Sequence, residues 1–372
     1  MNENPKGKHP GRRRLIRIAF SLLSIAVLTY IAIMLITGRQ SSLFRLFGSR
    51  SDQSSFEMAD EYYFDVGRNR VFANLNGSPA AAGTLGIQVF DAGGAETLRD
   101  SFRMTSPAIY AQNGYAVSFD INGTAARVFT KTQIVSSIET NGPIISATIN
   151  KNGWTAICTQ DGVSRGVVTV YDSTGKAVYR VSLATGYVLS AALSQDNKGM
   201  AILNLTPEGS RVSYYNLNSE NVDRTFDLPS GLALNLWYDS NDDLLLISSQ
   251  ALNKVDKNNE CSEIYGFAGK HLRGYAIDED YIVLYLLDYN VGHSGRLVAL
   301  SSDGSHVEEM TTEKEIISLS LSDGYLAVLQ SDGFAFYDTD FERLLILGQY
   351  ALAAGAGKVL SIGGGKIGRA HV

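Results

Sequence analysis

Glycines 363–368 form the segment that most resembles a cofactor site. GGGKIG, Gly363 to Gly368, satisfies the pattern G-x-G-x-x-G. In a dinucleotide site this pattern follows a strand and precedes a helix, whose N-terminus faces the pyrophosphate. No helical pattern follows here, so we interpret the segment as a glycine-rich turn between strands and expect no cofactor. We assign no function to Ile367 to Val372, because one possible coding of IGRAHV coincides with a sequencing adapter.

Two acidic clusters contain the residue types that bind calcium. Asp239 to Asp243 (DSNDD) opens like an EF-hand loop, which requires Gly at its sixth position and Glu at its twelfth. Leu244 and Gln250 occupy those positions. We therefore interpret the cluster as a turn between strands, with a looser calcium site as the alternative. Asp278 to Asp280 (DED) is interpreted as a similar, solvated turn.

Histidines are the remaining candidates for a metal site or a hydrolytic triad. His271, His293 and His306 fall in one stretch of the chain, whereas His9 and His371 lie near its two ends. No pair has the short H-x-x-x-H spacing of a zinc site, and no G-x-S-x-G element is present for a serine nucleophile. We therefore predict no metal site and no catalytic residue.

Cysteines and tyrosines support structural rather than chemical roles. Cys158 lies in an apolar run and Cys261 in a polar turn of a different repeat, so we predict two independent residues, not a disulfide. The 19 tyrosines could stack on glycans. Most occupy strand positions, however, where packing between sheets explains them.

The composition excludes several classes of protein. Hydrophobic residues make up 45% of the chain and the net charge is only −6, which is unlike a disordered polymer. The 32 basic and 38 acidic residues, with the basic ones clustered at the N-terminus, argue against nucleic acid as a partner. The chain is therefore expected to fold around a large apolar core.

The N-terminal region has the pattern of a membrane anchor. Residues 1–17 form a basic tail, and Ile18 to Thr37 is a run without charged residues. Such a run is about 30 Å long as a helix, which matches the hydrocarbon core of a bilayer. The run exits into Thr37-Gly38-Arg39-Gln40 without a small-residue cleavage site, so an uncleaved anchor is favoured over a signal peptide or a buried core helix.

The charges on either side of this span predict its orientation. The positive-inside rule places the more basic flank in the cytoplasm. We thus predict a cytoplasmic tail (1–17), a transmembrane helix (18–37), a stalk (38–55) and an extracytoplasmic domain (56–372) in the cell membrane. Basic residues before the span outnumber those after it: Lys6, Lys8, Arg12, Arg13, Arg14 and Arg17 precede it, whereas Arg39, Arg45 and Arg50 follow.

Two interleaved patterns recur along residues 56–372. In the first, an apolar strand ends before a polar turn, and its marks lie 37 to 45 residues apart. In the second, a turn that is often Asn-Gly or Asp-Gly precedes a buried strand. Two hairpins per repeat of about 40 residues predict an all-β propeller with four-stranded blades, with a sandwich or another β-repeat as the alternative. The first set of marks is Asp91, Thr130, Asp172, Asn216, Asp256, Ser301 and Asp338; the second is Arg70, Tyr115, Trp154, Met200, Leu244, Tyr281, Tyr325 and Lys358.

The repeat count favours eight blades, with seven as the alternative. The second pattern occurs eight times, but the last repeat has only about three strands, ALAAGAG, KVLSIGG and KIGRAHV. Propellers commonly complete such a blade with a strand from the other terminus, which removes an open sheet edge. We expect residues near Phe56 to Asp60 to supply that strand.

A resemblance to a known family rests on the basic tail, the single span and repeat segments such as YAVSFD, VTVYDSTGKAVYR and DGYLAVLQSDGFAFYD. The chain from about residue 12 to 366 resembles a family of membrane-anchored bacterial propellers, mainly from Gram-positive clostridia, that is known as a domain of unknown function. The blades are also similar to WD40 and quinoprotein-like repeats. The Trp-Asp ending of WD40 repeats is absent, and the quinoprotein docking pattern survives only as Asp172 to Lys176, with Tyr179 in the Trp position.

The sequence therefore predicts a membrane-anchored, extracytoplasmic propeller that acts as a non-catalytic binding scaffold or sensor for a protein partner in the cell envelope. A rigid propeller offers a broad, loop-rich face for recognition. The alternative is a ligand-binding or enzymatic propeller that acts on a glycan, a peptide or a quinone-like cofactor at the central channel. A structural subunit of a membrane complex is a third class.

Overall fold

Runs of β-branched and aromatic residues form strands throughout the part of the chain that the structure describes. This computed structural model describes residues 63–348 except 161, 163, 220, 229–230 and 257–259, together with 356–363 and 366–371. The chain divides into two compact units, Met1–Ala59 and Asp60–Val372, and every described residue belongs to the second. Those residues include no helix that could cross a membrane. The predicted span, Ile18 to Thr37, lies outside them.

Seven antiparallel sheets of four strands each follow one another along the chain. Within each sheet the strand order is the chain order, so every blade is a meander. The first four blades are β1 (Val71–Asn74), β2 (Pro79–Gly83), β3 (Gly86–Phe90), β4 (Glu96–Ser101); β5 (Pro107–Gln112), β6 (Tyr115–Asp120), β7 (Ala125–Thr130), β8 (Ile134–Glu139); β9 (Ile144–Ile149), β10 (Thr155–Thr159), β11 (Gly166–Tyr171), β12 (Ala177–Leu183); and β13 (Tyr187–Leu193), β14 (Gly199–Thr206), β15 (Gly209–Asn216), β16 (Val222–Asp227). The next three are β17 (Ala233–Tyr238), β18 (Leu244–Ser248), β19 (Ala251–Val255), β20 (Cys261–Gly266); β21 (His271–Ile277), β22 (Tyr281–Leu287), β23 (Gly295–Ser301), β24 (Val307–Thr312); and β25 (Ile316–Ser322), β26 (Tyr325–Gln330), β27 (Gly333–Asp338), β28 (Arg343–Gly348).

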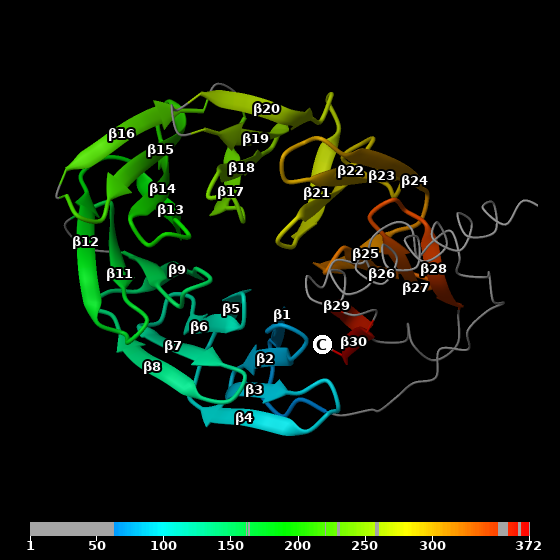
Figure 1. Ribbon diagram of the computed structural model, residues 1–372, viewed down its shortest axis with the longest axis horizontal. Helices are drawn as coiled ribbons and strands as arrows, with labels where there is room; N and C mark the ends of the chain where they lie inside the picture. The colour runs from blue at the N-terminus through cyan, green and yellow to red at the C-terminus, as the bar shows by residue number, and fades with distance from the viewer. Residues whose placement is uncertain are drawn as a thin grey trace, which may run out of the picture. The chain divides into compact units, whose positions relative to one another are not determined.

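The blades form a seven-bladed propeller, so the expectation of eight four-stranded blades is corrected to the alternative count. The described part of the last repeat contains only two strands, β29 (Ala356–Gly363) and β30 (Lys366–His371), which pair with each other. The first of them contacts β25 of the seventh blade and β1 of the first blade (Figure 1). Residues 56–60, which we expected to complete this sheet, lie outside the described part of the chain.

Burial explains why each strand has its composition. The first strand of each blade lies nearest the centre of the ring and the fourth lies at the periphery (Figure 1). The middle strands pack against neighbouring blades on both faces, so β10 and β18 are buried at every position. Fourth strands such as β4 and β12 alternate exposed polar residues with partly buried ones. Charged residues on these edges oppose pairing with other chains.

The Asn-Gly and Asp-Gly signals form two-residue hairpins. Asn113 and Gly114 have φ angles of 46° and 81°, and Asp323 and Gly324 have 52° and 72°. Positive φ at both central residues is the conformation of a type I′ turn, which Asn, Asp and Gly adopt at least cost. In each case the flanking residues pair directly, as Gln112 does with Tyr115. Six marks of the second sequence pattern therefore stand at the hairpin between the first and second strands of a blade, whereas Arg70 directly precedes β1 and Lys358 lies within β29.

The recurring aspartate of the first pattern caps the turn between the third and fourth strands. The Oδ1 atom of Asp172 accepts hydrogen bonds from the backbone N–H groups of Thr174 (2.9 Å) and Lys176 (3.1 Å). Asp91 and Asp338 make the same pair of bonds to residues two and four positions on. A carboxylate suits this place because it satisfies two backbone donors that the sheet leaves unpaired.

At one end of the propeller, polar turns of neighbouring blades form hydrogen bonds with one another. We call the end that carries the turns between first and second and between third and fourth strands the hairpin face. The opposite end, which carries the turns between second and third strands and the links between blades, is the crossover face. On the hairpin face, turns of neighbouring blades bind one another: Asn150 Nδ2 donates to Ser194 O (2.9 Å), Gln195 N to Asp242 Oδ1 (2.7 Å) and Gly324 N to Asp278 Oδ2 (2.9 Å).

Candidate functional site

Five consecutive blades carry a β-bulge at the same place, near the crossover end of the first strand. In β13, for example, Val188 pairs with Asn204 and Ser190 with Leu203, so Leu189 has no partner on β14. The same one-residue shift occurs in β9, β17, β21 and β25. We call the five unpaired residues the bulge ring: Ile145, Leu189, Leu234, Arg273 and Ile317.

Bulging changes the environment of these side chains. An extra residue leaves the ladder and re-aims its side chain, and bulges of this kind are common beside functional sites. Leu234 is 52% exposed and Ile317 is 48% exposed, whereas the residues next to them, Ala233 and Ile316, are buried. Two members of the bulge ring, Leu234 and Ile317, thus present exposed aliphatic side chains, whereas Ile145 and Leu189 pack partly buried against the core.

Arg273 is the one charged member of the bulge ring. Its side chain is exposed, and no ion pair to it occurs among the described residues. The strand that carries it, β21, is tied to the preceding blade, because Asn235 Nδ2 of β17 donates a hydrogen bond of 3.2 Å to Tyr275 Oη. Leu234 directly precedes this asparagine, and Arg273 lies two residues before the tyrosine.

Two tyrosines lie deeper along the inner strands than the bulge ring. Burial, and to a smaller extent the proximity of Tyr275, raises the pKa of Tyr110 to about 12. Burial likewise raises the pKa of Tyr275, while its hydrogen bond to Asn235 acts in the opposite direction. These residues belong to β5 and β21, which face each other across the ring (Figure 1). Two phenols that are neutral at pH 7 therefore lie within reach of each other's charge.

The crossover face as a whole is rich in exposed apolar side chains. Eight of the twelve large exposed apolar or tyrosine side chains in the described residues lie there, which is more than scattered exposure would place on one end. Val178, Val222 and Val307 lie instead on outer strands, and Tyr63 precedes β1. The eight are Leu85, Ile121, Tyr187, Leu232, Leu234, Tyr289, Val291 and Ile317.

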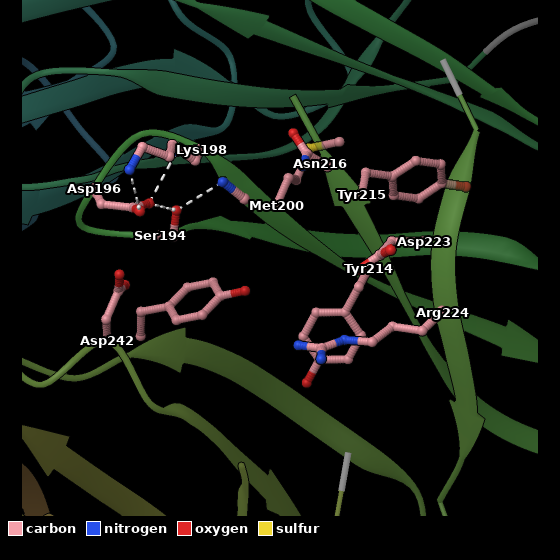
Figure 2. Close-up of a pocket in the computed structure, with 12 residues that line it drawn as sticks. Ser194, Asp196, Lys198, Met200, Tyr214, Tyr215, Asn216, Asp223, Arg224 and Asp242 are labelled. Carbon is pink, nitrogen blue, oxygen red and sulfur yellow. Dashed lines mark hydrogen bonds and ion pairs between the residues drawn. The ribbon is translucent and has the colours of Figure 1, made fainter. Parts of the chain in front are cut away.

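A second candidate is a small pocket of about 230 Å³ on the hairpin face, where the fourth and fifth blades meet (Figure 2). Asp196 and Lys198 of the β13–β14 turn, Arg224 of β16 and Asp242 of the β17–β18 turn contribute polar groups to its wall. Asp196 accepts a hydrogen bond of 2.7 Å from Ser194 Oγ, a contact that lowers its pKa.

Tyr214 is the unusual member of the pocket wall. The guanidinium of Arg224 lies 4.3 Å from the centre of its ring, as Figure 2 shows. The residue is only 5% exposed, and its hydroxyl has no hydrogen-bond partner among the residues that the structure describes. Burial raises the pKa of this phenol, which keeps it neutral and able to donate. A buried donor without an acceptor is uncommon in native proteins.

The acidic clusters serve as turns. Asp239 Oδ1 accepts hydrogen bonds of 2.9 Å from the N–H groups of Asn241 and Asp243, and the carboxylate of Asp243 pairs with Lys254 at 2.6 Å. Asp278 is not the solvated residue that we expected. It accepts three backbone N–H bonds, one of them from the next blade, and burial raises its pKa.

The histidines are not brought together. His271 begins β21 and His293 lies in the β22–β23 turn, both at the crossover face. His306 lies in a turn of the hairpin face, where its Nε2 atom is 3.3 Å from Asp340 Oδ1. Among the described residues, no three His, Cys, Asp or Glu side chains are grouped so that they could hold a metal ion.

The remaining sequence candidates have structural positions. Gly363 ends β29 and Lys366 begins β30, so a strand rather than a helix follows the glycines. Both cysteines are free, as expected: Cys158 is buried in β10, and Cys261 begins β20. Burial raises the pKa of the Cys158 thiol to about 12, which makes it unreactive at neutral pH.

Sequence reasoning missed the bulge ring and Tyr214. A bulge depends on the pairing of two strands, and no residue type in the inner strands announces one. Apolar residues near the start of an inner strand, such as Leu234 and Ile317, are what a buried core strand would also contain, so the sequence does not set them apart.

Comparison with solved structures shows the same architecture at low sequence identity. The β-propeller domain of Cps50 (Swd1) from Myceliophteria thermophila is 11% identical with a TM-score of 0.50, and the match covers 70% of this chain and 92% of that one. AztD from Citrobacter koseri is 12% identical with a TM-score of 0.53, covering 76% and 86%. Identity this low shows the fold alone.

A search of curated proteins finds no match to this chain. A family model does match, over residues 50–343, which contain all of the first six four-stranded blades and most of the seventh. The chain belongs to the family of unknown function DUF5711.

Proposed function

We propose that this protein is a membrane-anchored, extracytoplasmic scaffold that binds a polypeptide partner of the cell envelope through its crossover face. The cellular address rests on the basic tail of residues 1–17 and the uncharged run of residues 18–37. The propeller supplies a rigid support on which a recognition surface can be held.

The observation that supports this function most is the contrast between the two faces. On the hairpin face the polar turns are engaged with one another across blades, as in the bonds of Asn150 and Gln195. On the crossover face eight large apolar side chains remain exposed. Exposed apolar side chains gathered on one face are typical of protein interaction sites.

Affinity capture with matched variants tests this proposal. The full-length protein is cross-linked in native membranes and purified, beside Leu234→Asp and Val178→Asp variants. Both residues are exposed, and both are bulged out of their ladders. Leu234→Asp is expected to abolish the enrichment of the partner, whereas Val178→Asp, on an outer strand, leaves it unchanged. Equal enrichment by all three proteins, or none by the parent, overturns the proposal.

The pocket of the hairpin face supports a second function, the binding of a small polar ligand. Its support is the unpartnered Tyr214 hydroxyl, which needs an acceptor. A thermal-shift screen of small acids, sugars and peptides tests this function. A ligand that stabilises the parent protein but not Tyr214→Phe supports this second function. A screen that finds no such ligand contradicts it.

A further inference from the structure

We propose that Arg273 binds a carboxylate of the partner polypeptide, and that apolar residues flanking this carboxylate pack on Leu234 and Ile317. The crossover face then selects a segment in which Asp or Glu lies among large apolar residues. This inference rests on the proposed function and names the chemistry of the partner.

The position of Arg273 carries the argument. The three residues occupy the same bulge in the fifth, sixth and seventh blades, so they form consecutive members of one ring. All three are exposed, and the outer two are aliphatic. A cation between two apolar surfaces complements an acid between two apolar residues. The planar guanidinium can also bind a carboxylate with two parallel hydrogen bonds.

Two other basic residues of the crossover face, Lys270 and Arg165, already have partners. Lys270 Nζ pairs with Asp288 Oδ1 at 2.5 Å. Arg165 donates to Tyr187 Oη at 2.5 Å and lies 5.1 Å from the centre of the tyrosine ring. Binding to an anionic membrane or to nucleic acid requires several basic residues acting together. A single cation between two exposed aliphatic side chains therefore favours one carboxylate of a polypeptide over a polyanion.

The surroundings of Arg273 hold it in place for this role. The bond between Asn235 and Tyr275 joins β21, which carries the bulge of Arg273, to β17 of the preceding blade. Below the ring, the pKa values of Tyr110 and Tyr275 are raised by burial, so no negative charge from these phenols competes for the guanidinium. The guanidinium itself stays charged in proteins, so it can bind a carboxylate on the crossover face.

Selection of random linear peptides displayed on phage tests the inference. The bait is the full-length protein, beside Arg273→Gln and a matched Arg180→Gln variant, which changes an exposed arginine on the outer strand β12. The parent and Arg180→Gln are expected to enrich peptides in which Asp or Glu is flanked by large apolar residues. Arg273→Gln is expected to enrich apolar peptides without the acid.

A binding measurement quantifies the effect. The most enriched peptide and its acid-to-amide counterpart are titrated against the three proteins by fluorescence polarisation. The acid is expected to bind the parent about tenfold more tightly than the amide, as for a hydrogen-bonded charge pair, and Arg273→Gln removes this ratio. Unchanged thermal unfolding shows that the variant is folded.

The outcomes separate this inference from the function beneath it. Enriched peptides without an acid, or a tenfold ratio that survives Arg273→Gln, overturn the role of Arg273 but leave a scaffold that depends on Leu234. In a competition experiment, acetate and glycerol 3-phosphate are each tested for displacing the bound peptide. If glycerol 3-phosphate displaces it as effectively as acetate, the site favours a lipid headgroup, and the inference is also overturned. Failure of the Leu234→Asp capture experiment removes the scaffold itself.

Discussion

Asn74 and Ser322 lie 248 residues apart in the sequence, and the Nδ2 atom of Asn74 donates a hydrogen bond of 2.9 Å to the Oγ atom of Ser322. Asn74 ends the inner strand of the first blade, and Ser322 ends that of the seventh. The bond therefore joins the two ends of the run of seven blades. Nearby, Ser361 N of β29 donates to Ser320 Oγ at 2.9 Å, so a second contact supports the same junction.

Loss of this closing bond is expected to destabilise the whole ring. Ser322→Ala leaves the half-buried amide of Asn74 without its partner, which costs about 1 kcal/mol of unfolding free energy. Urea titration of Ser322→Ala, Asn74→Ala and the double variant measures the coupling between the two residues. Additive effects of the two single substitutions would show that the bond contributes nothing.

Asp278 is expected to be the most sensitive of the turn aspartates. Its carboxylate accepts N–H bonds from Asp280 (3.0 Å), Tyr281 (2.7 Å) and Gly324 (2.9 Å). Asp278→Ala leaves three backbone donors unpaired and should lower the free energy of unfolding by about 2–4 kcal/mol. Asp280→Ala, a neighbour whose side chain makes none of these bonds, is the control. Equal effects of the two substitutions contradict this account.

Removal of the Tyr214 hydroxyl should not lower the stability of the protein, whereas removal of the Tyr179 hydroxyl should. The buried hydroxyl of Tyr214 has no partner, so Tyr214→Phe is expected to leave the protein as stable as the parent or more stable by about 1 kcal/mol. Tyr179 Oη donates to Ser219 O at 2.9 Å, so Tyr179→Phe is expected to be destabilising. Thermal unfolding of the two variants decides, and a lower midpoint for Tyr214→Phe than for Tyr179→Phe refutes the prediction.

Acid should weaken the turn that Asp172 caps. The hydroxyl of Thr174 and then the backbone N–H groups of the turn hold the pKa of Asp172 below its ordinary value. A lowered pKa means that the stabilisation is fully present above the unfolded pKa of about 3.9 and is lost as the pH falls through the folded value. Asp172→Asn should therefore be less stable than the parent at pH 7, and the gap should narrow below about pH 4. Urea midpoints of the two proteins across this pH range measure the difference in stability. A difference that does not change with pH contradicts the prediction.

The periodicity of the chain was enough to predict the blades. Alternating apolar strands and Asn-Gly or Asp-Gly turns, such as Asn113-Gly114, are local signals, because a type I′ hairpin is specified by the two residues in it. The capping aspartates are equally local, since Asp172 bonds only to residues two and four positions away. The number of complete blades was less predictable, because it depends on which strands of the last repeat find partners.

Sequence alone thus determined the repeat, the all-β class and the turn chemistry, because each depends on contacts within a few residues. Tertiary structure decided the rest. The exposure of Leu234, the isolation of Arg273 and the missing partner of Tyr214 arise from strand register and from packing between blades. A one-residue bulge turns an inner-strand position toward a different environment without changing the residue type. Only the paired strands show where such a shift occurs, and the candidate binding surface consists of such positions.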